Sequence, residues 1–184
     1  MRAPASEAMF SACAMLLALP ALAASDPDRQ AADTAQWLMP VAALATTYWR
    51  DDREGRWQFF ESLGTTVVAT EALKKAFNST SWGRRPNGGE NSFPSGHTSS
   101  TCGAGFFLQR RYGWALGAPA LGVAAFTGYT RVDERAHHWR DVIAGCALAW
   151  GSARYFVDRQ RSGQLELQPE LGARSASMSF RWRY

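Results

Sequence analysis

Cysteine, histidine and long uncharged apolar runs are all scarce in this chain. Of its 184 residues, three are cysteine and three are histidine. Its uncharged apolar windows fall short of the roughly 20 residues that a membrane-spanning helix needs, and the mean hydropathy is −0.27. We also find no internal repeat and no long low-complexity segment. The hydropathy and the short windows argue against a protein that is wholly embedded in lipid.

The positive charge is too small to indicate a nucleic-acid partner. There are 20 Lys and Arg residues against 16 Asp and Glu residues, which gives a net charge of +4. An excess of this size, spread among acidic residues, suits an anionic substrate or an anionic membrane surface. We therefore expect no nucleic-acid partner, and the oligomeric state stays open.

Residues 1–23 have the pattern of a secretory signal peptide. Arg2 gives a weakly positive start, residues 12–19 are apolar, and residues 21–23 form a small-residue cleavage pattern. An uncleaved membrane anchor is the alternative, although the apolar run is short for a span. Export predicts a place in the cell envelope, either at the membrane with the site facing the periplasm or free in the periplasm.

Removal of the signal peptide would leave two of the three cysteines, Cys102 and Cys146. Both lie on helical patterns, and export permits a disulfide between them. Free cysteine is also among the residue types most often buried as a small hydrophobic side chain. We favour this second interpretation, two buried cysteines that do not pair.

Residues 24–160 have the pattern of one helical domain. Apolar residues recur near helical spacing, and the frequent Ala, Gly and Ser residues allow helices to pack closely. The predicted fold class is therefore all-α, a compact helical bundle. The expected helices are 37–49, 57–77, 98–111, 114–129 and 139–157, with residues 51–55 ending the first and residues 78–91 forming a loop.

The tail, residues 161–184, has a different pattern. Apolar and polar residues alternate over 164–168 and again over 177–184, and Pro169 and Gly172 lie between these stretches. This alternation predicts a short β-hairpin. Two strands cannot close a barrel and an isolated hairpin is marginal, so we expect the hairpin to pack on the helices or on a partner.

The residues that suit chemistry better than a core fall into three groups. They are Arg85-Pro86, then Pro94-Ser95-Gly96-His97, then Arg131 with His137 and Asp141. Guanidinium groups offer a planar fork of donors for phosphate oxygens. A helix is expected to begin just after Gly96, and the free N–H groups of a helix start attract anions. The groups together predict a site that holds a tetrahedral oxyanion with fixed positive charge, using no metal ion and no cofactor.

The spacing of His137 and Asp141 indicates how an imidazole could be activated. Residues four apart share one face if a helix begins near His137. The carboxylate can then accept a hydrogen bond from one ring nitrogen and leave the other free to attack phosphorus. His97 is then the expected general acid for the leaving alkoxide. A His–Asp pair alone is often only a solvated helix pair, so the inference depends on the whole set.

The order and spacing of these groups resemble the type 2 phosphatidic acid phosphatase (PAP2) superfamily, which includes bacterial acid phosphatases and vanadium haloperoxidases. The resemblance runs from about Gln36 to Phe156. It implies that His137 is a nucleophile forming a phosphohistidine, that Asp141 orients it, and that His97 is first acid and then base. His138 lacks the matching spacing from the preceding arginine and to the aspartate. The phosphate-binding residues that the resemblance implies are Lys74, Arg85, Ser95, Gly96 and Arg131.

Two departures from the family pattern concern these assignments. The third motif usually opens with Ser-Arg, and Thr130-Arg131 stands here, which keeps the hydroxyl. The first motif usually has six residues between its lysine and Arg-Pro, whereas ten separate Lys74 from Arg85 and nine separate Lys75 from it. About four extra residues therefore lie near Ser79 to Trp82. We favour Lys74 as the phosphate-binding lysine and keep Lys75 as the alternative.

The resemblance implies a metal-independent phosphatase of phosphomonoesters or pyrophosphates. A phosphorylated lipid is the favoured substrate, because apolar helices and eight tryptophans would place the site near a membrane. A soluble periplasmic acid phosphatase of broad specificity is the first alternative. A vanadate-dependent haloperoxidase and a non-catalytic envelope module docking through its tail are the others.

Overall fold

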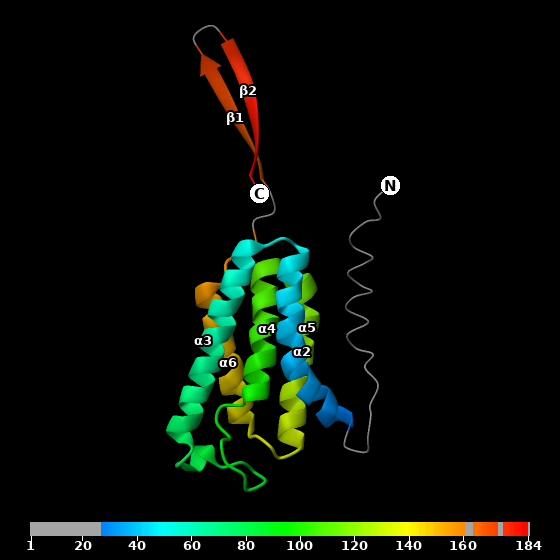
Figure 1. Ribbon diagram of the computed structural model, residues 1–184, viewed down its shortest axis with the longest axis vertical. Helices are drawn as coiled ribbons and strands as arrows, with labels where there is room; N and C mark the ends of the chain where they lie inside the picture. The colour runs from blue at the N-terminus through cyan, green and yellow to red at the C-terminus, as the bar shows by residue number, and fades with distance from the viewer. Residues whose placement is uncertain (1–26, 161–163, 173–174, 184) are drawn as a thin grey trace.

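The structure, a computed structural model, describes residues 27–160, 164–172 and 175–183. The expected signal peptide at residues 1–23 lies outside this part. Five α-helices and one short 3-10 helix make up the first stretch (Figure 1). In chain order they are α2 (Pro27–Trp49), α3 (Arg53–Phe77), η1 (Ser81–Gly83), α4 (Gly96–Tyr112), α5 (Trp114–Asp133) and α6 (Trp139–Phe156).

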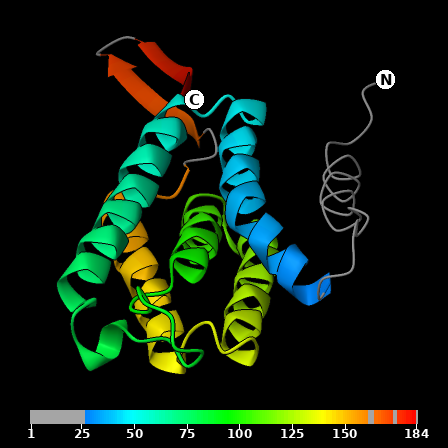
Figure 2. The ribbon, with the colours of Figure 1, turned by 60° about the horizontal axis from the view of Figure 1, so that its bottom comes forward.

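The helices form a bundle in which α4 is central. It packs against α2, α3, α5 and α6, and Figures 1 and 2 show it between them. Its buried face carries small residues such as Gly103, Ala104 and Gly105, together with Phe107. Small side chains let neighbouring helices approach closely. The predicted all-α bundle is confirmed for these residues.

The first two helices are longer than expected. The α2 helix begins at Pro27, not at residue 37, and so includes the polar residues before Trp37. The charged stretch 51–55 is not a long break between helices. Asp52 caps α3 instead, because its side chain accepts a hydrogen bond from the Gly55 N–H at 2.8 Å, and α3 begins at Arg53. A charge cluster that looks like a loop can thus serve as a helix cap.

The end of the bundle formed by the start of α3 and the end of α4 is held by a buried ion pair. The Arg111 guanidinium donates to both carboxylate oxygens of Asp52, at 2.6 and 2.7 Å. It also donates to Gln58 at 3.3 Å and to the Asp158 carbonyl at 2.9 Å. Tyr112 adds a hydrogen bond to Asp52 at 2.9 Å. This network connects α3, α4 and the segment after α6.

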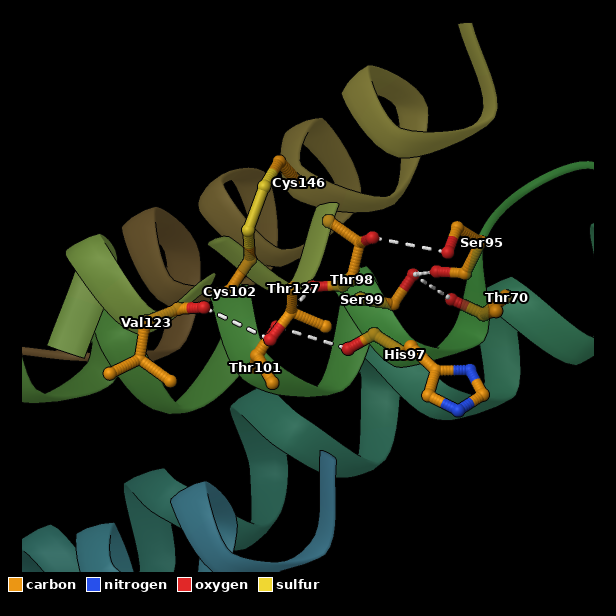
Figure 3. Close-up of a disulfide and its surroundings, with 10 residues drawn as sticks. All are labelled: Thr70, Ser95, His97, Thr98, Ser99, Thr101, Cys102, Val123, Thr127 and Cys146. Atoms are coloured by element: carbon orange, nitrogen blue, oxygen red, sulfur yellow. Dashed lines mark hydrogen bonds between the residues drawn. A yellow bond between two sulfur atoms is a disulfide. The ribbon is translucent and has the colours of Figure 1, made fainter. Parts of the chain in front are cut away.

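A disulfide joins Cys102 on α4 to Cys146 on α6 (Figure 3). Our interpretation of these residues as two unpaired buried cysteines is therefore wrong. The two Cα atoms are 5.3 Å apart, within the usual range for a disulfide, because small residues bring the two helices close. The crosslink connects the helices that follow the second and third sequence motifs.

The tail forms two strands, β1 (Gln164–Gly172) and β2 (Ser175–Arg183). They pair antiparallel, with Leu167 opposite Phe180. Neither strand lies against a helix of the described bundle (Figure 1). The expectation that the tail packs on the helices is therefore wrong, and packing on a partner stays a prediction.

Many large apolar side chains lie on the outer faces of the helices. Trp37, Val68, Ile143 and Trp150 are each more than half exposed. By length and hydropathy, no described helix meets the requirements of a bilayer-crossing segment.

Candidate active site

The sequence motifs meet at one end of the bundle, where α4 and α6 begin and α3 and α5 finish. The α4 helix starts at Gly96, directly after Pro94 and the N-cap Ser95. The first N–H groups of a helix have no acceptor within it and carry the positive end of its dipole. The start of α4 therefore presents backbone donors, at Gly96 and His97, to an anion.

The starts of α4 and α6 are held together by backbone contacts. The Ser95 N–H donates to the Asp141 carbonyl at 3.0 Å. Gly145, one turn along α6, permits this approach, because a Cβ there would lie 2.8 Å from both the Ser95 carbonyl oxygen and the Ser99 hydroxyl. Ser99 in turn accepts a hydrogen bond from Thr70 of α3 at 2.9 Å (Figure 3). Three helices are thus fixed around the second motif.

Asp141 is a fully buried carboxylate in the first turn of α6. Its Oδ2 accepts hydrogen bonds from the Ser92 hydroxyl at 2.5 Å and from the His138 N–H at 2.9 Å. Burial by itself raises the pKa of Asp141, but the nearby His137 and these two hydrogen bonds outweigh it and lower the pKa to about 2. The carboxylate is therefore ionised at neutral pH.

His137 lies just before α6, with 3% of its surface exposed. Its Nδ1 is 3.7 Å from the Asp141 Oδ2, so the hydrogen bond that we expected is not formed. The reason is that α6 begins at Trp139 with His138 as its N-cap, which places His137 outside the helical turn. Burial lowers the pKa of His137, and Arg85 adds to the lowering, while Asp141 opposes it.

His97 lies in the first turn of α4, beside Ser95 (Figure 3). Its Nε2 is 3.0 Å from the Asp33 Oδ1 of α2. Burial, followed by Arg131 and His137, lowers the pKa of His97 to about 4 against the opposing effect of Asp33. His97 at the start of α4 and His137 just before α6 thus lie at the same end of the bundle.

Two buried arginine Nε atoms have no hydrogen-bond partner among the described residues. They belong to Arg85 in the loop before α4 and to Arg131 near the end of α5. The terminal nitrogens of Arg131 donate to Asp33 at 2.8 Å and to Glu134 at 3.1 Å. A buried donor left unpaired lowers the stability of the fold by on the order of 1–3 kcal/mol. An oxyanion beside these two arginines would accept hydrogen bonds from both unpaired Nε–H groups.

Lys74 and Lys75 differ in where they lie. The Nζ of Lys74 lies at the start of α4, since a Cβ added to Gly96 would be 2.8 Å from it. Its side chain is 18% exposed and pairs with Glu71 at 3.0 Å, whereas Lys75 is exposed. The four extra residues between the lysine and Arg85 include η1, which takes up the added length before the chain reaches Arg85.

The aromatic residues around η1 fix this insertion. The Trp82 ring is 5.8 Å from that of Phe77 and 5.0 Å from that of Phe93. The Arg140 guanidinium lies over the Trp82 ring at 5.1 Å. These contacts hold η1 against the end of α3 and the start of α6.

The structure brings the predicted site residues together in one cluster. They are Lys74, Arg85, Ser95, Gly96, His97, Arg131, His137 and Asp141. Sequence reasoning missed Asp33, Ser92 and Glu134, which supply the carboxylates and the hydroxyl that pair with them. Asp33 gave no signal because its segment was expected to precede the first helix, and Ser92 lay in a loop without a motif.

Comparison with known proteins places the chain in a family. The profile of the PAP2 superfamily matches residues 55–162. Lipid phosphate phosphatase 2 of Arabidopsis thaliana is 42% identical over 74 residues, which cover 33% of this chain and 26% of that protein. The chain thus spans about a quarter of that relative's length.

A solved structure shares the fold. The crystal structure of LpxE from Aquifex aeolicus superposes with a TM-score of 0.59 at 19% sequence identity, covering 71% of this chain and 86% of that one. The family profile spans more than half of the chain and contains every predicted site residue. The chain is a member of the PAP2 superfamily.

Proposed function

We propose that the protein is a phosphatase that hydrolyses phosphomonoesters or pyrophosphates through a phosphohistidine. The observation that carries the proposal is the pair of imidazoles, His97 and His137, beside two arginines whose buried Nε atoms have no partner among the described residues. A phosphoryl group offers the acceptors that these donors lack. Its transition state spreads negative charge over three equatorial oxygens, which fixed cations stabilise without a metal ion.

In the first step the Nε2 of His137 attacks phosphorus, because its Nδ1 is the nitrogen that faces Asp141. The Nε2–P bond forms as the bond from phosphorus to the leaving oxygen breaks. Ionised Asp141 stabilises the positive charge that develops on the imidazole ring. His97 gives its proton to the leaving oxygen, so that the alcohol or phosphate departs neutralised.

In the second step His97, now neutral, accepts a proton from water as the water oxygen attacks phosphorus. The phosphorus–nitrogen bond breaks, inorganic phosphate is formed and His137 is restored. His97 must be protonated at the start of each cycle. An anionic phosphate beside it favours the protonated imidazole and raises its pKa above the value of about 4 that it has in the free site.

Three kinds of donor would hold the phosphate oxygens. Arg85 and Arg131 supply guanidinium groups, Lys74 supplies a point charge, and the start of α4 supplies backbone N–H groups. Arg131 offers its Nε to the substrate while its terminal nitrogens stay with Asp33 and Glu134. The proposal assigns Lys74 this role in preference to Lys75, because the Nζ of Lys74 lies beside Gly96.

We further propose that the substrate is a phosphorylated lipid and that the protein is exported to the cell envelope. Support comes from exposed aromatic side chains close to the site in the sequence. Trp37, Tyr129 and Trp139 are 72%, 56% and 54% exposed, and each lies within four residues of Asp33, Arg131 or His137. Tryptophan and tyrosine favour the interface between membrane and water. The pattern at residues 1–23 supports export.

The test is phosphate release by purified protein with a chelator present, from lipid phosphates in mixed micelles and from soluble phosphomonoesters. We expect turnover, inhibition by vanadate, and a higher rate on the lipid substrates. Equal rates on both kinds of substrate, with the protein recovered in the periplasmic fraction, would favour a soluble acid phosphatase instead. No release from any substrate, with the protein folded, would contradict the proposed activity.

The intermediate is tested with two single variants. His137→Ala should abolish turnover and should carry no acid-labile phosphate after rapid denaturation in alkali. His138→Ala removes the neighbouring imidazole, which is 38% exposed, and should keep activity within about tenfold, since general acid–base or nucleophilic roles are worth roughly 100-fold or more. Full activity in His137→Ala would rule out that residue as the nucleophile.

A further inference from the structure

Asp33 on α2 joins two residues of the site that come from different helices. Its Oδ1 is 3.0 Å from the Nε2 of His97 on α4 and accepts a hydrogen bond from Arg131 of α5 at 2.8 Å. The Asp33 side chain is 46% exposed, whereas that of Arg131 is 5% exposed. A carboxylate outside every sequence motif thus contacts both the expected general acid and an arginine expected to bind phosphate.

The contact determines which nitrogen of His97 can face the substrate. Because Nε2 faces Asp33, the nitrogen left for the leaving group is Nδ1. A carboxylate acceptor also fixes the neutral tautomer, with the proton on Nε2 and the lone pair on Nδ1. That tautomer is the one that can accept a proton from water in the second half of the reaction.

The other charged groups around His97 act against its protonation. They come from each neighbouring element: Lys74 at the end of α3, Arg131 near the end of α5 and His137 before α6. Arg131 and His137 disfavour the imidazolium, and Asp33 favours it. Glu134 also pairs with Arg131, at 3.1 Å, and so weakens the positive field at the site.

We propose that Asp33 is a positioning residue for the general acid and base His97. The proposal rests on the phosphatase function proposed above. Through Nε2, Asp33 keeps the imidazole oriented with Nδ1 toward the leaving oxygen. In the first step the Nδ1 proton moves to that oxygen while the Nε2 proton stays shared with Asp33, and in the second step Nδ1 takes a proton from water. The contact with Arg131 holds the phosphate-binding guanidinium at a fixed position relative to His97.

The competing explanation is that Asp33 only occupies the anion site and must leave before substrate binds. The two explanations predict opposite results. A blocking carboxylate raises KM, so its removal would lower KM and increase kcat/KM. A positioning carboxylate acts in the chemical step, so its removal lowers kcat and leaves KM nearly unchanged.

The experiment compares Asp33→Asn, Asp33→Glu and Glu134→Gln with wild type. For Asp33→Asn we expect kcat to fall about 10- to 100-fold, which is part of the 100- to 10,000-fold that acid–base catalysis contributes, with KM within about threefold. The high-pH limb of the kcat profile should move to lower pH, because the protonated acid is lost earlier. Asp33→Glu keeps the charge and should recover part of kcat.

Glu134→Gln is the matched control, because it removes another carboxylate from Arg131 while Asp33 still faces His97. We expect a smaller fall in kcat and a smaller movement of the pH profile than in Asp33→Asn, because Glu134 acts on His97 through Arg131. An equal fall in Glu134→Gln and Asp33→Asn would overturn the proposal, since the effect would then come through Arg131 alone. An unchanged or raised kcat in Asp33→Asn, with a lower KM, would establish the blocking explanation.

A second measurement separates this proposal from the proposed function. The chain has only three histidines, so nuclear magnetic resonance can follow each imidazole, with His137→Ala and His138→Ala to assign them. We expect Asp33→Asn to move the titration of His97 to lower pH by about half a pH unit or more, and neutral His97 to carry its proton on Nε2. Wild-type protein without phosphatase activity would refute the function but leave this test in place. An unmoved His97 titration would overturn the role of Asp33.

Discussion

Two buried arginines at opposite ends of the bundle have different surroundings. Arg111 is 6% exposed and Arg131 is 4% exposed. Arg111 has a buried carboxylate, an amide and a backbone carbonyl as partners, with distances from 2.6 to 3.3 Å. Arg131 pairs with a half-exposed carboxylate and with a second carboxylate that is 14% exposed, and its Nε has no partner in the described part of the chain.

The difference separates a structural arginine from one placed for a ligand. At the Arg111 end the hydrogen-bonding capacity of the ion pair is used within the protein, so little is left for a substrate. At the Arg131 end, unpaired donors and two imidazoles with lowered pKa values lie at the same end of the bundle. Burial alone does not identify a functional charge; unsatisfied bonding capacity beside titratable groups does.

The largest effect that we expect from this comparison is the loss of activity in Arg131→Ala. Arginines that stabilise a phosphoryl transition state contribute roughly 1,000- to 100,000-fold to turnover, so kcat/KM should fall by about 1,000-fold or more. The melting temperature should change by only a few degrees, because Asp33, one of the two carboxylates left behind, is already 46% exposed. Steady-state kinetics and thermal denaturation on the same sample check both statements.

Arg131→Lys sharpens this result. Lysine keeps the charge but loses the planar fork, so its kcat/KM should lie between those of Arg131→Ala and wild type. If Arg131→Ala also lowered the melting temperature by much more than a few degrees, the contrast between the two ends of the molecule would fail.

The second effect is the loss of stability in Arg111→Ala. Removing one partner of a buried ion pair leaves the Asp52 carboxylate uncompensated, which costs about 3–5 kcal/mol in the free energy of unfolding. Urea denaturation followed by circular dichroism measures that loss. The activity of the folded fraction, assayed at low temperature, should stay near that of wild type, because the network lies at the far end of α4.

Arg111→Met combined with Asp52→Leu is the matched variant for this prediction. Replacing both partners by apolar side chains removes the uncompensated charge, so part of the lost stability should return. A double variant less stable than Arg111→Ala would show that the hydrogen bonds to Gln58 and Asp158, together with the cap that Asp52 gives α3, outweigh the effect of the uncompensated charge.

The fold was predictable from the sequence where one periodicity dominates. The α4, α5 and α6 helices were placed within a few residues because small and apolar residues recur at helical spacing between clear breaks such as Gly113. The start of α2 was not, since residues 27–36 are polar and their helix is stabilised by contacts such as that of Asp33 with α4 and α5. Asp52 was placed in a break because a capping aspartate and a loop aspartate look alike in one sequence.

The candidate site was predictable in its composition and less so in its geometry. The motifs identified the cations and imidazoles that the structure brings together. They could not show that Asp141 accepts its bonds from Ser92 and His138, because Ser92 lies far away in the sequence. The pairing of Cys102 with Cys146 was missed for the same kind of reason, since the distance between two helices depends on packing that spacing does not encode.

The smallest effect concerns pH, and it again separates the two ends, because all three histidines lie at the end of the bundle that carries the candidate site. The pKa of His97 in the folded protein is about 4, below its ordinary value of 6.5, with burial as the main cause. The native state therefore binds fewer protons than the unfolded state between these values, so this contribution to stability is complete above pH 6.5 and is lost as the pH falls toward 4. We expect the free energy of unfolding, measured in urea at several pH values, to fall over this window, with His97→Gln removing on the order of 1–2 kcal/mol of the fall after allowance for the partly exposed ring.

Asp52→Asn should lower stability at every pH in the window yet keep the wild-type slope, because the pKa of that carboxyl lies below its ordinary value of 3.8 and so outside the window. A wild-type slope in His97→Gln would mean that the fall arises elsewhere, and the pH response would no longer distinguish the two ends.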